Sequence, residues 1–122
     1  MTHWKPHLSR VVVVAACALS CAVAACSSNG TGSPTGSTCP SDSTLTYENF
    51  GQAFIANNCL ACHSNRESPT LTTQAAVAAN REELDLVAAA GPSSVNTQMP
   101  QGGSVTTADR QKLGEWLACG AP

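Results

Sequence analysis

Cys59-Leu60-Ala61-Cys62-His63 is the most informative stretch of the sequence, and the other features of the chain are interpreted in relation to it. Two residues between the cysteines allow both sulfur atoms to reach one edge of a porphyrin from a single turn of backbone. The histidine that follows directly is then held where its ring nitrogen can ligate the iron. The run is therefore typical of covalent haem attachment, with Cys59 and Cys62 as attachment sites and His63 as an axial ligand.

Two other chemistries use the same cysteine spacing. A structural zinc site normally needs four ligands, and a fourth ligand here would have to be Cys39 or Cys119. A thioredoxin-like dithiol expects a strand before the motif and a βαβ environment, whereas the sequence around this motif favours helices. Both interpretations are weaker than haem attachment, and both remain alternatives at this point.

The N-terminus has the pattern of a bacterial secretory signal. Basic residues precede an apolar run over 11–19, which is too short for a standard membrane span. Residues 23–26 (VAAC) resemble the lipobox of bacterial lipoproteins, in which the signal is cut before a cysteine that carries diacylglycerol. We therefore predict a signal peptide at 1–25 and lipid on Cys26. The alternative is an ordinary cleaved signal in which the cysteines are only small apolar residues: Cys17, Cys21 and Cys26.

Residues 26–38 are almost wholly Ser, Thr, Gly, Asn and Pro, which predicts a flexible tether with nothing to bury. Lipid on Cys26 followed by this tether would hold one small domain, 39–122, on a membrane surface without spanning it. A domain of roughly 80 residues has little core and usually needs disulfides, a metal or a cofactor. A haem would supply the missing bulk, since the domain holds only four aromatic residues: Tyr47, Phe50, Phe54 and Trp116.

Removal of the predicted signal leaves His63 as the only histidine and Met99 as the only methionine. Pro100 disfavours helical geometry at Met99, so the thioether is presented from an extended loop. An isolated loop methionine is ordinarily apolar packing. The predicted mature chain, however, has one haem motif and no second histidine that could ligate the iron. Met99 is therefore the candidate for the sixth iron ligand.

The composition also restricts the classes of function. After removal of the predicted signal, the chain has four basic and eight acidic residues. This balance argues against a nucleic-acid partner, because such a partner needs a basic patch. With His63 committed to iron, no Ser-His-Asp or Cys-His catalytic set can be assembled. We therefore do not expect an independent enzyme.

Four short helices are predicted: one from Thr46 into the haem motif, others at about 73–79 and 81–90, and one from Thr106 to Gly120. Asn80 is expected to cap the helix at 81–90, which should bury three apolar residues: Leu84, Val87 and Ala88. Leu113, Trp116 and Leu117 share one apolar face of the last helix. Gly51 lies inside the first helix, where glycine costs about 1 kcal/mol relative to alanine. A glycine at such a position indicates the close approach of another segment, most simply another backbone.

Cys39 precedes the first predicted helix, and Cys119 ends the last one. An exported protein resides in an oxidising compartment, where free thiols tend to pair. If the terminal helices touch, Cys39 and Cys119 are expected to form a disulfide. If they do not, the two residues are separate free thiols.

Together, the haem motif, the downstream Met99 and the terminal helices resemble the class I cytochrome c family across the predicted domain. The resemblance implies an all-α fold wrapped around one covalently attached haem c, with the first and last helices crossing. It also implies that Gly51 meets Leu113 or Trp116 where the helices cross. The end of the chain looks like that of cytochrome-like lipoproteins, which favours the bridge between Cys39 and Cys119.

Pro69-Thr70-Leu71 resembles the family's Gly-Pro-x-Leu turn, although Ser68 replaces the glycine. In the family, the proline carbonyl accepts a hydrogen bond from the haem histidine. The resemblance therefore implies that Pro69 orients His63.

The expected function is that of a monohaem c-type cytochrome, a one-electron carrier on the periplasmic side of a bacterial membrane. Axial ligation by His63 and Met99 would leave no iron position for a substrate. The expected partners are a redox donor and a redox acceptor, which the sequence does not identify. One alternative is a haem-based sensor whose sixth position is open. Another is a cytochrome subunit of a larger respiratory complex.

Overall fold

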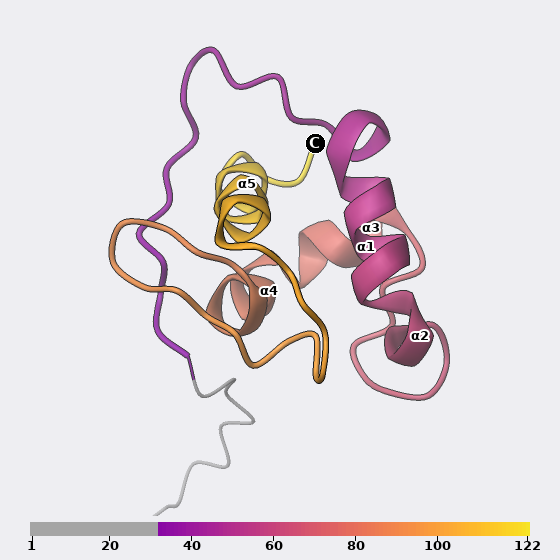
Figure 1. Ribbon diagram of the computed structural model, residues 1–122. Coiled ribbons are helices and arrows are strands. Elements are labelled where there is room, and N and C mark those ends of the chain that lie inside the picture. Colours follow the sequence, from indigo (N-terminus) through magenta and orange to yellow (C-terminus); the bar gives the residue numbers. More distant parts are fainter. Residues whose placement is uncertain (1–31) are drawn as a thin grey trace, which may run out of the picture.

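The computed structural model of the chain describes residues 32–122, and its structured elements are helices (Figure 1). The predicted signal peptide at 1–25 and the lipid site at Cys26 lie outside the described residues. The elements are a π-helical turn and five α-helices: η1 (Tyr47–Gly51), α1 (Gln52–Asn58), α2 (Leu60–His63), α3 (Gln74–Ala79), α4 (Arg81–Ala88) and α5 (Thr107–Ala118). One isolated bridge joins Ala90 to Val95. Within residues 32–122, no helix is long and apolar enough to cross a membrane. The all-α class expected from the sequence is confirmed.

The first helical segment begins where the sequence predicts. The Oγ1 of Thr46 accepts a hydrogen bond from the N–H of Asn49, and the side chain of Asn49 accepts one from the N–H of Thr46. This reciprocal pair satisfies two donors that a helix N-terminus would otherwise leave unpaired. η1 and α1 then run without a break toward Cys59, so the helix leads directly into the motif.

The last helix is also confirmed. The Oγ1 of Thr106 accepts a hydrogen bond from the N–H of Asp109 at 3.1 Å, and the helix continues to Ala118. Gly120 then adopts a φ of 94°, a left-handed conformation that favours glycine and ends the helix. The predicted apolar face is buried, and its members are Leu113, Trp116 and Leu117.

The middle helices differ from the prediction at two points. The predicted cap of α4 is wrong, because the side chain of Asn80 donates to the carbonyl of Ala76 in α3 and makes no capping bond to α4. α4 ends at Ala88, before the predicted boundary, because Ala90 is drawn out of the helix to donate to the carbonyl of Arg110 in α5. The predicted buried residues of α4 are confirmed: Leu84, Val87 and Ala88.

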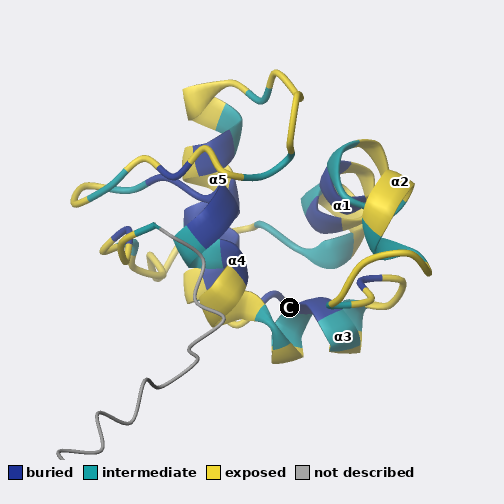
Figure 2. Cartoon of the chain, turned by 90° about the horizontal axis from the view of Figure 1, so that it is seen from below, coloured by how far each residue is buried: buried dark blue, intermediate teal, exposed yellow. Residues whose placement is uncertain are grey.

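The start and the end of the domain meet at Trp116. A Cβ atom built on Gly51 would overlap the indole ring of Trp116, so the close approach predicted at Gly51 is made by a side chain and not by another backbone. Figure 1 views α5 nearly end-on beside α1, and Figure 2 views α1 end-on beside α5, so the two helices cross. The carbonyl of Pro122 accepts hydrogen bonds from the N–H of Tyr47 (2.6 Å) and from Nε1 of Trp116 (3.3 Å). A disulfide links Cys39 to Cys119 near this crossing.

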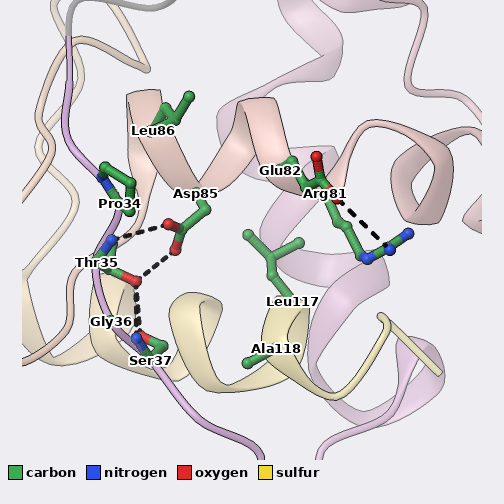
Figure 3. A pocket seen from close by; sticks show the side chains of 10 residues that line it. All are labelled: Pro34, Thr35, Gly36, Ser37, Arg81, Glu82, Asp85, Leu86, Leu117 and Ala118. Carbon is green, nitrogen blue, oxygen red and sulfur yellow. Dashed lines mark hydrogen bonds and ion pairs between the residues drawn. The ribbon is translucent and has the colours of Figure 1, made fainter.

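The tether predicted at 26–38 is wrong for residues 32–38, which pack against α4 as a strap (Figure 3). Thr35 is fully buried, and both its N–H (2.9 Å) and its hydroxyl donate to the carboxylate of Asp85. The amide of Asn96 donates to the carbonyl of Ser33 at 2.7 Å. Short polar side chains can be ordered wherever a folded partner satisfies them, and composition alone does not reveal that partner. Residues 26–31 of the predicted tether lie outside the described residues.

Candidate functional site

Cys59 lies between α1 and α2, and Cys62 and His63 lie in α2, so the three residues share one turn of backbone. The carbonyl of Cys59 accepts hydrogen bonds from the N–H of Cys62 (3.1 Å) and of His63 (2.9 Å), which closes that turn. The thiol of Cys59 is half-buried, whereas the thiol of Cys62 is exposed. The spacing thus presents both sulfur atoms and the imidazole from one short and locally hydrogen-bonded segment.

The ring of His63 has a defined orientation. Its Nδ1 lies 2.9 Å from the carbonyl oxygen of Pro69, and this oxygen can only accept a hydrogen bond. Nδ1 therefore carries the proton and donates, which leaves the lone pair of Nε2 available to a metal. The N–H of Leu71 donates to the carbonyl of His63 at 2.8 Å and closes the loop that brings Pro69 back to the ring. This is the arrangement that the resemblance implied for Pro69.

A cavity separates the motif from the segment that carries Met99. Its inner part, of about 80 Å³, is bounded by Cys59, His63 and Met99 together with residues that are mostly apolar: Phe54, Asn58, Ser68, Pro69, Leu71, Glu83, Leu84, Val87, Ala88 and Pro100. An adjoining outer part, of about 340 Å³, shares those three residues and adds Ala61, Cys62, Glu67 and Gln101. The structure therefore brings the predicted attachment and ligand residues to one cavity with an apolar interior and a more polar mouth.

Met99 is half-buried and faces this cavity from a loop that is fastened at its backbone. The N–H of Met99 donates to the carbonyl of Val87 in α4 at 2.9 Å. Its carbonyl accepts a hydrogen bond from Nη1 of Arg110 in α5 at 2.7 Å. The position of Met99 is thus determined by two helices rather than by its own loop.

Arg110 is the residue of this region that the sequence analysis missed. It is only 4% exposed, and burial lowers the pKa of its guanidinium. A sequence signal did exist, because Arg110 precedes Leu113 by three residues and Leu117 by seven and so shares their buried face. A charged residue on an apolar stripe is the pattern that should have indicated a buried polar contact.

Cys39 and Cys119 do not join the cavity, because their sulfur atoms are bonded to each other. Within residues 32–122, no group of three or more His, Cys, Asp or Glu side chains gathers to hold a metal ion. A larger hollow of about 480 Å³ lies between the strap and the helices α4 and α5, and Figure 3 shows its lining. That hollow contains neither a residue of the motif nor Met99, so the chemistry of the motif belongs to the cavity beside it.

No family model matches the chain, and no curated protein and no solved structure gives a significant match. The functional argument therefore depends on the residues of this cavity.

The two motif thiols are expected to react differently in the haem-free chain. Burial raises the pKa of Cys59 to about 11, so that only about one molecule in a thousand carries its thiolate at pH 8. Cys62 is exposed and can be reached by reagents from solvent. Iodoacetamide at pH 8 should therefore label Cys62 well before Cys59, and labelling of Cys59 should accelerate as the pH rises toward 11. Peptide mass mapping over time measures both rates, and equal rates at pH 8 would contradict the burial of Cys59.

Proposed function

We propose that the protein is a monohaem c-type cytochrome that carries single electrons at the cell envelope. The observation that carries the proposal is the cavity in which Cys59, His63 and Met99 meet. Its apolar interior, its two cysteines at the attachment spacing and its single imidazole with a free Nε2 fit a haem. This fit depends on the donor atoms and their positions, and the resemblance to class I cytochromes c agrees with it.

Each residue then has a distinct role. Cys59 and Cys62 would hold the haem through thioether bonds, and His63 and Met99 would ligate the iron. The bound haem would supply a one-electron couple of ferric and ferrous iron. Pro69 holds the imidazole of His63 in the tautomer that offers Nε2 to the metal. The apolar wall would exclude water from the bound group, and its buried members are Phe54, Leu71, Leu84, Val87 and Ala88.

The competing interpretations of the motif have less support. A zinc site would need Cys39 or Cys119 as a fourth ligand, and both sulfur atoms are occupied by the disulfide. A thioredoxin-like dithiol would follow a strand, whereas α1 precedes Cys59 here. The low basic content of the domain also gives no reason to propose a nucleic-acid partner.

The proposed location is the periplasmic side of a bacterial membrane, through lipid on Cys26. Cys26 lies six positions before Gly32, the first described residue, and a fully extended chain of that length spans at most about 22 Å. A strap that begins at residue 32 would keep the domain close to the membrane. Its redox donor and acceptor would therefore be reached at the membrane surface.

Covalent haem is the first quantity to measure. The membrane-extracted protein should give a pyridine haemochrome spectrum typical of haem c, and its intact mass should include one haem and a diacylglycerol group. In the oxidised state it should show the weak red absorption band of methionine-ligated haem, and carbon monoxide should change the reduced spectrum little. A double variant, Cys59→Ser with Cys62→Ser, serves as the control and should lose the covalent haem.

Two results would contradict the proposal. A membrane-extracted protein that is folded but carries no haem would show that the chain does not acquire one, and bound zinc would show that the motif serves a different metal. A haem protein whose reduced form binds carbon monoxide readily would instead favour the sensor, the second candidate function. Co-purification with fixed partner subunits would favour a component of a larger respiratory complex.

A further inference from the structure

One buried guanidinium connects α5 to three carbonyl groups around the segment that carries Met99. Nη1 of Arg110 lies within hydrogen-bond distance of the carbonyl oxygens of Ala88 (2.6 Å), Asn96 (2.9 Å) and Met99 (2.7 Å), and its two N–H groups are shared among these three acceptors. The backbone of Arg110 adds a fourth connection, because its carbonyl accepts a hydrogen bond from the N–H of Ala90 at 2.9 Å. A single residue of the last helix therefore fastens the end of α4 and the loop that follows it.

Among the residues that the structure describes, no carboxylate pairs with the charge of Arg110. The one ion pair within residues 32–122 joins Arg81 to Glu82, on the surface of α4. Burying a cation without a counter-ion is unfavourable unless other groups satisfy it, and here the three carbonyl dipoles do so. A buried cation that loses its acceptors is strongly disfavoured. The loop is therefore held in the conformation that brings these carbonyl groups to the guanidinium of Arg110. This makes Arg110 a stringent constraint on the geometry of the loop.

We propose that Arg110 is a positioning residue that keeps Met99 at the wall of the cavity that it shares with His63, and so would keep Met99 on the iron. The inference rests on the proposed function for the ligand role of Met99. The rest of the loop supports it, since the N–H of Met99 donates to Val87 and the N–H of Asn96 donates to Ala89, each at 2.9 Å. These bonds hold the loop to α4, and Arg110 adds the only side-chain bond to the carbonyl of Met99 among the described residues.

The first test measures how often Met99 leaves the iron. Added imidazole binds the oxidised protein only when the sixth position is free, so its apparent affinity reports the fraction of open loop. In the full haem-loaded chain, Arg110→Leu should raise that affinity by at least about tenfold and weaken the red band of the oxidised state. Arg110→Gln, which keeps an N–H₂ donor without the charge, should give a smaller increase. It also keeps the test open if the leucine variant does not fold.

Thr35→Ala is the matched control. It removes a buried hydrogen bond to Asp85 and should lower stability, but the hydrogen bonds of Thr35 within residues 32–122 go to Asp85, Ser37 and Ser93 and not to Met99 or Arg110. Imidazole affinity should therefore remain at the wild-type value in this variant. Suppose that Arg110→Leu and Arg110→Gln bind imidazole with the wild-type affinity, as the control Thr35→Ala is expected to do. Arg110 then serves only general stability, and the proposal is overturned.

A second readout needs no haem. Amide hydrogen exchange in the haem-free full chain should accelerate at Met99 and Asn96 by at least about tenfold in Arg110→Leu, relative to amides of η1 such as that of Phe50. Unchanged relative exchange at Met99 would overturn the positioning role. If the wild-type protein carried no covalent haem, the proposed function and the ligand role of Met99 would fail together. The exchange data would then still decide whether Arg110 positions the loop.

Discussion

Replacing Cys39 and Cys119 together with serine is expected to lower the free energy of unfolding by about 4–5 kcal/mol. The disulfide joins residues that are 80 positions apart, so it closes a loop that includes nearly the whole folded domain. In the chain-entropy description, a cross-link over such a distance removes much of the conformational freedom of the unfolded chain. A loss of this size is comparable to the entire stability of many small domains.

Urea denaturation of the wild type and of the double serine variant measures this loss. The wild type under a reducing agent is the matched control, because it should lose about as much stability as the variant. The variant itself should not respond to the reducing agent. A loss below about 1 kcal/mol would contradict the prediction and would show that the unfolded chain is already compact. The crossing of the terminal helices would then be maintained by packing alone.

Replacing Trp116 with alanine is expected to cost about 3–5 kcal/mol, the second large effect. Trp116 is 0% exposed, and its ring lies 6.4 Å from that of Tyr47 and 5.9 Å from that of Phe50, measured between centroids. Alanine would leave a cavity at the point where η1 crosses α5. Because α1 continues directly into Cys59, the proposed haem site should also lose order. Thermal or urea unfolding measures the stability, and the red band of the oxidised state reports the site.

The contact between Gly51 and Trp116 allows a sharper test through a double-mutant cycle. Gly51→Ala alone should destabilise by about 1–3 kcal/mol, because the new methyl group overlaps the indole ring. In a Trp116→Leu background, the same change should be neutral or stabilising, since alanine favours a helix by up to about 1 kcal/mol over glycine. An equal effect of Gly51→Ala in both backgrounds would show that the two residues do not interact.

The helices and the motif could be predicted because their signals are local. Thr46 and Thr106 each find their capping partner three residues away, and the turn at Cys59 closes within four residues. Such contacts depend on spacing along the chain, which the sequence displays directly. The buried face of α5 follows from periodicity in the same way.

Three features escaped prediction for a common reason. Asn80 had two possible partners, and its bond to Ala76 in the preceding helix prevailed over a cap for α4. The hydroxyl of Thr35 found a carboxylate 50 residues away, which turned a segment with the composition of a tether into a packed strap. Arg110 found its acceptors in a loop that α5 meets only after folding. In each case the sequence did not show which of the available groups the side chain would choose as its partner.

The sequence alone determined which groups the site contains: two cysteines, one histidine and one methionine, on and between helices that their caps and periodicity define. Only the tertiary structure decided that Met99 and His63 line one cavity, that Arg110 donates to the carbonyl of Met99, and that residues 32–38 belong to the folded body. The physical reason is the range of the interactions. Caps and turns form between neighbours in the chain, whereas buried hydrogen bonds form wherever packing brings donors and acceptors together and excludes water.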